Sequence, residues 1–267
     1  MRVIATAIFF ATNLLGFALF AWPLILPADV LILSNLSDAT WLAAALAALA
    51  VVMIAAQISA RLLDSKSVAI VAILVALIAA LRLMGAGAVG LEPMWFLLIL
   101  AARAFGSQLG YAIALLSMLV SALFTGGVGP WLPFQIFAAG WIAIGAALVP
   151  RSLSNKFEVL ALALYGAVAA FLFGLLMDLQ LWPWLLGTDT QLSFQPGGSV
   201  AENLSRFITF HFATALAWDL PRALLTFTLI LLTGRAVLNS LNRAKQRLGW
   251  QSTPLRASER ATEQMGA

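Results

Sequence analysis

The sequence predicts an all-α protein that crosses a lipid bilayer several times. Of its 267 residues, 63% are apolar and only 10% are charged, whereas soluble proteins carry about 25% charged residues. The mean hydropathy is +0.99, and apolar stretches long enough for a membrane-spanning helix recur along the whole chain. These observations predict a polytopic integral membrane protein with about eight transmembrane helices.

Prolines, glycines and charged residues divide the apolar sequence into eight helical stretches. The first stretch ends near Pro23 and Pro27, because proline cannot continue a helix. It is too long for the apolar region of a signal peptide and lacks a small-residue cleavage site, so we interpret it as a spanning helix. The fourth stretch is short and, at about 1.5 Å per residue, barely crosses a core of ~30 Å. The expected helices cover residues 3–26, 41–62, 67–84, 93–104, 106–124, the segment from the turn at 125–135 to 149, 157–181 and 207–233.

The charged residues predict how the chain is oriented. Eight crossings put both termini on one side, and that side holds most of the basic residues: Arg2, Arg61, Lys66, Arg103, Arg151, Lys156, Arg235, Arg243, Lys245, Arg247, Arg256 and Arg260. The opposite side holds Arg206 and otherwise acidic residues: Asp29, Asp38, Glu92, Asp189 and Glu202. Because basic loops stay in the cytoplasm, we expect both termini there. The loops at 85–95, 125–135 and 183–206 are then expected outside together.

Few residues are able to carry covalent chemistry. The chain has no cysteine, one histidine (His211), no P-loop and no His-Glu-x-x-His motif. We therefore expect no enzyme activity, no metal site and no cofactor. The net charge of +4 lies in the loops and the tail, so we expect contact with lipid and none with nucleic acid. Uphill transport would need an ion gradient or a separate ATPase subunit.

Polar residues inside the apolar stretches are the first candidates for function. Asp219 and Arg222 are three residues apart and so share a helix face, and Pro221 between them removes one helical hydrogen bond. The two residues form either a structural ion pair beside a kink or the polar floor of a cavity. Asp178 and Arg82 also lie within helical stretches, where a charged group normally faces a partner or water.

The turn at 125–135 reads TGGVGPWLPFQ and interrupts two helices. Its three glycines permit unusual backbone angles, and Pro130 and Pro133 exclude a regular helix. Two interpretations are open: a tight turn with aromatic residues at the membrane surface, or a rigid, aromatic edge of a ligand pocket.

Several of these features together resemble a known family. They are the face of alanines spaced by four in 67–84, the ending Leu81-Arg82-Leu83, the short helix ending in RAFG, the G-x-x-x-G start of the next helix, the turn GGVGPWLPFQ and the run AWDLPRALLTF. This set resembles the substrate-specific (S) component of energy-coupling factor (ECF) transporters, in its actinobacterial form. The resemblance covers about residues 67–240, expected to be a six-helix core. Residues 1–66 would add two N-terminal helices, and 241–267 a basic cytoplasmic tail that we expect to be disordered.

The resemblance implies a bacterial plasma-membrane subunit that binds a vitamin or related micronutrient from outside. Such a subunit docks on a transmembrane coupling (T) subunit that carries two ABC ATPases. By the resemblance, the docking face consists of Ala72, Ala76 and Ala80, and the pocket lies under the outer loops. A long outer loop with Pro196, Gly197 and Gly198 favours cobalamin or another large cofactor.

Aromatic and polar residues near the outer loops are the candidate ligand contacts. Flat aromatic rings would stack on a conjugated ligand, and side chains with hydrogen-bonding or charged groups would orient it. The expected stacking residues are Trp95, Trp131, Phe134 and Trp184, and the expected polar contacts are Gln135, Arg82, Glu92 and Asn203. An alternative function is a stand-alone proton-coupled transporter that uses Asp178 or Asp219. A lipid-modifying membrane enzyme is disfavoured by the lack of a nucleophile, metal cluster or carboxylate pair.

Overall fold

The computed structural model describes residues 2–25, 36–59, 65–85, 88–185 and 190–247. The regular elements in these ranges are all α-helices, which confirms the predicted fold class for this part of the chain. The helices are α1 (Arg2–Ile25), α2 (Leu36–Ser59), α3 (Ser65–Met84), α4 (Met94–Phe105), α5 (Ser107–Thr125), α6 (Leu132–Leu148), α7 (Asn155–Leu185), α8 (Val200–Thr214) and α9 (Leu216–Arg247).

Length and composition make the chain a multi-pass membrane protein. Four segments are long and apolar enough to span a bilayer: Ile4–Ile25, Ser107–Thr125, Lys156–Leu185 and Leu216–Arg247. Four shorter apolar helices accompany them: Thr40–Met53, Val68–Met84, Met94–Phe105 and Leu132–Leu148. The helix boundaries before α7 lie within a few residues of those expected from the sequence, apart from the start of α2.

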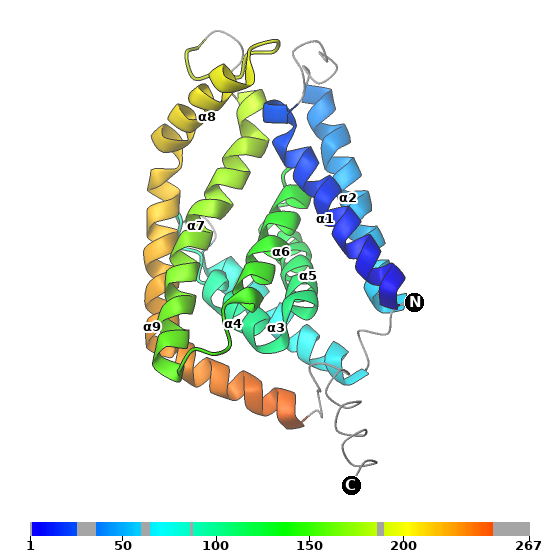
Figure 1. Ribbon diagram of the computed structural model, residues 1–267, viewed down its shortest axis with the longest axis vertical. Coiled ribbons are helices and arrows are strands. Elements are labelled where there is room, and N and C mark those ends of the chain that lie inside the picture. The colour runs from blue at the N-terminus through cyan, green and yellow to red at the C-terminus, as the bar shows by residue number, and fades with distance from the viewer. Residues whose placement is uncertain (1, 26–35, 60–64, 86–87, 186–189, 248–267) are drawn as a thin grey trace.

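The last predicted helix, 207–233, is divided differently in the structure. Helix α8 begins at Val200, inside the segment expected to be a loop, and a break at Ala215 separates it from α9. Ala215 keeps helical angles and donates its N–H to the His211 carbonyl at 2.8 Å, so the two helices follow each other closely (Figure 1). Helix α7 continues through Pro183 to Leu185.

Helix α9 continues to Arg247, so residues 241–247 are helical and not disordered as expected. Leu238 is buried and Leu241 packs on the same core, so the helix gains apolar contacts well beyond residue 233. The remainder of the expected tail, 248–267, lies outside the described residues, as do 86–87 and 186–189 of the loops expected to be outside.

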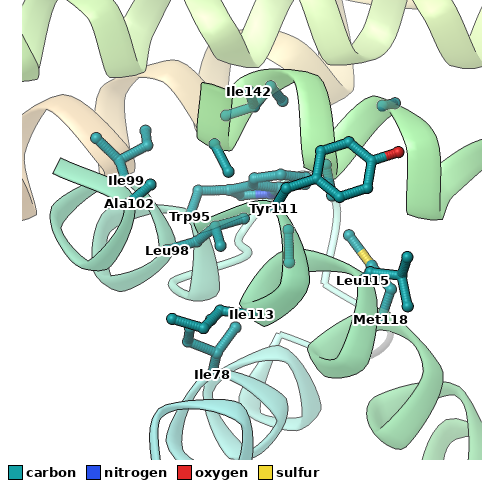
Figure 2. Packing of buried hydrophobic residues seen from close by; sticks show 14 of the residues in the cluster. Ile78, Trp95, Leu98, Ile99, Ala102, Tyr111, Ile113, Leu115, Met118 and Ile142 are labelled. Carbon is teal, nitrogen blue, oxygen red and sulfur yellow. The ribbon is translucent and has the colours of Figure 1, made fainter. Parts of the chain in front are cut away.

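Helix α4 lies in the middle of the bundle. Eleven of its twelve residues are buried, and Figure 2 shows its side chains Trp95, Leu98, Ile99 and Ala102 among residues of α3, α5 and α6. A helix that is apolar on all sides is normally enclosed by protein. Its short length is therefore compatible with a core position, because a helix enclosed by protein has no need to cover the full bilayer thickness.

Helices α1 and α2 pack into the same hydrophobic core as the helices of 67–240. The Phe20 ring of α1 meets the Phe134 ring of α6 edge-on, with ring centroids 4.9 Å apart. Asn13 of α1 accepts a hydrogen bond from Trp141 Nε1 of α6 at 2.7 Å. In Figure 1 this helix pair forms one edge of the molecule, and α7 with α9 forms the other. The two N-terminal helices are therefore an integral part of the bundle.

Candidate functional site

Arg82, in the last turn of α3, contacts the two helices that flank the turn at 125–135. Its Nη1 donates to Ser121 Oγ of α5 at 2.8 Å, and its Nη2 donates to Gln135 Oε1 of α6 at 2.8 Å. Gln135 lies in the first turn of α6, where Pro133 fits because the first N–H groups of a helix have no partner within it. The structure thus brings together two of the sequence-predicted residues, Arg82 and Gln135, and adds Ser121.

Glu92 joins the loop before α4 to α9. Its Oε2 accepts from Arg222 Nε at 2.9 Å and from Trp95 Nε1 at 2.9 Å. Arg222 Nη1 donates to Asp219 Oδ1 at 2.7 Å, which confirms that the two residues three apart share a face. Glu92 also lies close enough to Arg82 for its charge to act on the guanidinium. We refer to Ser121, Gln135, Arg82, Glu92, Arg222 and Asp219 as the polar chain.

Gly90 explains how the loop reaches α9. Its φ of +66° lies in the left-handed region, which glycine adopts without a steric penalty. A Cβ at this position would collide with the Trp218 carbonyl, so the loop backbone lies directly on the first turn of α9. This contact holds Glu92 beside Arg222, one turn further along the helix.

Aromatic rings border the polar chain on the α7 side. The rings of Trp95 and Phe173 lie 4.5 Å apart between centroids, and the Arg222 guanidinium carbon lies 5.2 Å from the Phe173 centroid, within the range of a cation–π contact. The next residue, Gly174, faces Asp219 so closely that a Cβ would collide with the carboxylate. Helices α7 and α9 are therefore packed closely at Gly174 and Asp219, with no space for a larger side chain at position 174.

The charges of the polar chain are unevenly distributed. Around Arg222 there are two carboxylates, Glu92 and Asp219, for one guanidinium. Asp219 is buried, and its second oxygen, Oδ2, lacks a hydrogen-bond partner among the described residues. Arg82 has the opposite balance, because its two hydrogen-bond acceptors are neutral. The polar chain is therefore negatively charged around Arg222 of α9 and positively charged around Arg82 of α3.

The other four predicted ligand contacts lie apart from the polar chain. Trp131 is 46% exposed and donates its Nε1 to the Gly127 carbonyl at 3.1 Å, within its own turn. Phe134 is buried against Phe20. Trp184 lies near the end of α7, where its ring centroid is 5.5 Å from that of Trp22. Asn203 lies near the beginning of α8 and forms hydrogen bonds with the Gln195 backbone.

The three alanines of the expected docking face are exposed. Ala72, Ala76 and Ala80 are on the outside of α3, together with the exposed Ile73 and Leu77. The opposite face of the same helix carries the buried residues Val71, Leu74, Val75, Ile78 and Ala79. Within the described structure, this face of α3 thus points away from the core.

A second polar group joins α7 to α8. Asp178 Oδ2 is 2.8 Å from His211 Nδ1 and accepts from Thr214 Oγ1 at 3.3 Å. The His211 ring lies nearly parallel to Phe207, with centroids 6.1 Å apart. The sequence marks Asp178 and His211 individually, on two different helices. Within α8, His211 lies four residues after Phe207 and three before Thr214, a spacing that places these three residues on one helix face.

Basic residues gather at the other end of the bundle. Arg103, at the end of α4, pairs with Glu158 at 2.6 Å and also donates to the Val149 and Pro150 carbonyls. Lys245 donates to the Ala104 carbonyl at 2.9 Å. Helix α4 therefore has Glu92 and Trp95 at its beginning and a group of basic residues at its end.

The polar chain is suited to binding a ligand through hydrogen bonds and charge. Among the described residues, no group of three or more His, Asp and Glu side chains is placed to hold a metal ion. Comparisons of the chain with protein-family models, with curated proteins and with solved structures find no match.

Proposed function

We propose that this chain is the substrate-binding membrane subunit of an ECF-type importer for a vitamin-type solute. The observation that supports this best is the exposed face of Ala72, Ala76 and Ala80 on α3. Small residues at this spacing allow another membrane helix to approach closely. A transmembrane coupling subunit with two attached ATPases would dock there and supply the energy.

The polar chain is the proposed solute site. It lies at the beginning of α4 and α9, whereas the basic residues Arg103 and Lys245 lie in the last turns of these two helices. If basic residues mark the cytoplasmic side, a solute would reach the polar chain from outside, and both termini would be cytoplasmic. Trp95 and Phe173 offer an aromatic border, and Arg82, Gln135 and Glu92 offer hydrogen-bonding groups of both kinds.

The test is a substitution that blocks docking without touching the polar chain. We expect Ala76→Trp, purified from its native membrane, to lose the co-purifying ATPase activity that the wild type retains, because a bulky ring keeps the partner helix at a distance. The control is Ala48→Trp, an exposed alanine on α2, which should retain the ATPase activity. Equal ATPase activity in wild type and both variants would refute the docking face.

A stand-alone proton-coupled transporter is the second candidate function. It is favoured by the buried Asp219 carboxylate, whose Oδ2 is unpartnered in the described structure, and by the contact of Asp178 with His211. Carboxylates inside membrane helices commonly serve as proton carriers. Proteoliposomes that contain only this chain separate the two functions: uptake of the co-purified solute driven by an imposed proton gradient would favour the second.

A further inference from the structure

Arg82 is a positively charged group whose direct partners carry no charge. It is partly buried at the end of α3, and no carboxylate among the described residues forms an ion pair with it. Its contacts are one hydroxyl, Ser121 Oγ, and one amide oxygen, Gln135 Oε1. Guanidinium groups removed from water are normally matched by carboxylate or phosphate oxygens, which the planar fork binds in a bidentate way.

Glu92, whose charge acts on Arg82, forms its hydrogen bonds with other residues. Its Oε2 accepts from both Arg222 Nε and Trp95 Nε1 at 2.9 Å. A second anion beside Arg222 would meet the two carboxylates of Glu92 and Asp219. An anion beside Arg82 would meet a guanidinium, neutral dipoles and the more distant field of one carboxylate, Glu92, so Arg82 is the place in the polar chain where a negative group is favoured.

We propose that Arg82 binds an anionic group, a carboxylate or a phosphate, on the transported solute. The inference depends on the proposed function in one respect, namely that a solute binds at the polar chain. Gln135 supports it, because Oε1 faces Arg82 while no described residue accepts a hydrogen bond from Nε2. The amide is therefore able to donate to the same anion. The anion would replace Gln135 Oε1 or Ser121 Oγ as the acceptor for Arg82.

The first experiment uses acetate and inorganic phosphate as probes. Purified protein in non-ionic detergent is unfolded by heat at constant ionic strength, with chloride exchanged for either anion, and tryptophan fluorescence gives Tm. We expect Tm of the wild type to rise by about 2–4 °C more than that of Arg82→Gln, because a ligand that binds only the folded state stabilises it. The control Arg206→Gln removes an arginine paired with Glu202 and should respond like the wild type. An equal response of wild type and Arg82→Gln would refute the proposal.

A second variant tests the same idea without any ligand. Gln135→Glu places a carboxylate within reach of Arg82, since the present Oε1 is already at 2.8 Å. We expect this variant to have a higher Tm than the wild type in chloride and to lose the response to acetate and phosphate. The comparison variant Gln135→Met, which removes the amide but adds no charge, should weaken the response without abolishing it. A Gln135→Glu variant that still responds like the wild type would show that Arg82 does not bind the anion.

A third experiment distinguishes an anionic solute from an anionic lipid headgroup as the ligand of Arg82. Mixed micelles that contain phosphatidylglycerol are compared with neutral micelles, again with wild type and Arg82→Gln. Stabilisation that needs Arg82 and occurs with phosphatidylglycerol but with neither acetate nor phosphate would overturn the solute proposal in favour of a bound lipid. None of these measurements depends on docking, so their failure is distinct from a failure of the Ala76→Trp experiment.

Discussion

Replacing Gly174 with alanine should disrupt a close contact between α7 and α9. A Cβ at this position collides with both carboxylate oxygens of Asp219. The carboxylate cannot move aside freely, because Arg222 holds Oδ1 at 2.7 Å and Glu92 in turn holds Arg222 at 2.9 Å. The substitution therefore either separates the two helices or displaces Asp219 from Arg222.

Both routes are destabilising. Overpacking a tight contact costs about 1–3 kcal/mol, and removing one partner from a buried ion pair costs about 3–5 kcal/mol. Against this, alanine is favoured over glycine in a helix by roughly 1 kcal/mol. The net cost is roughly 0–2 kcal/mol by the first route and roughly 2–4 kcal/mol by the second. Because the overlap of a Cβ with Asp219 Oδ2 would be severe, the first route falls at the upper end of its range, and we expect Gly174→Ala to lower the free energy of unfolding by roughly 2–4 kcal/mol. At about 2–4 °C per kcal/mol for a chain of this size, the fall in Tm should be several degrees.

The assay is thermal unfolding in detergent, followed by the fluorescence of the nine tryptophans. The matched control is Gly234→Ala on the same pair of helices, where a Cβ would lie 3.3 Å from Val159 Cγ1 and 3.4 Å from Ile230 Cγ2. Both distances are close to ordinary van der Waals contact, so Gly234→Ala should change the stability by less than about 1 kcal/mol. In an Asp219→Ala background, Gly174→Ala should also become nearly harmless, since the colliding carboxylate is gone. Equal stability of the two glycine variants, or an unchanged cost in the Asp219→Ala background, would refute this reasoning.

Two further predictions concern the turn at 125–135 and the orientation of the chain in the membrane. If Trp131 stacks on the solute, Trp131→Ala should weaken binding of the co-purified solute about tenfold to a hundredfold in calorimetric titration. Trp131→Phe should keep most of the affinity, because it retains an aromatic ring. Wild-type affinity in Trp131→Ala would exclude the turn from the site. The second prediction is that 183–206 is outside and that α9 ends in the cytoplasm. The chain has no cysteine of its own, so single cysteines are labelled specifically. A membrane-impermeant thiol reagent on intact cells should label Ser199→Cys and leave Gln246→Cys unlabelled, and the reverse pattern would contradict the orientation.

Much of the fold could be predicted because apolar length and helix breakers are local properties. Pro27 and the glycines of 126–129 interrupt the apolar pattern, and the described helices α1, α5 and α6 begin or end close to these points. Only the first part of α8, residues 200–206, was missed as helix, because this stretch (VAENLSR) is more polar than a spanning helix. Its start was nevertheless readable: Ser199 and Glu202 have the spacing of a capping box, and Ser199 Oγ does accept from the Glu202 N–H at 3.2 Å.

The candidate site could be predicted only residue by residue. Arg82 and Asp219 were marked as charged residues inside apolar stretches, because such residues need partners in a membrane, and Glu92 was marked as a charged residue in the loop before the short helix. The partners themselves depend on the packing of distant segments: Glu92 and Arg222 are 130 positions apart, and Arg82 and Gln135 are 53 apart. No local pattern carries that information.

Helix α3 links the two proposals of binding and docking. Ala76 and Arg82 are six residues apart, which corresponds to roughly 9 Å along the helix axis. The alanine face points outward, whereas Arg82 reaches inward to Ser121 and Gln135. An anion at Arg82 would replace one of these contacts and so change how the end of α3 is held against α5 and α6. Since the same rigid helix presents the alanine face, solute binding at one end would bias the position of the docking face at the other.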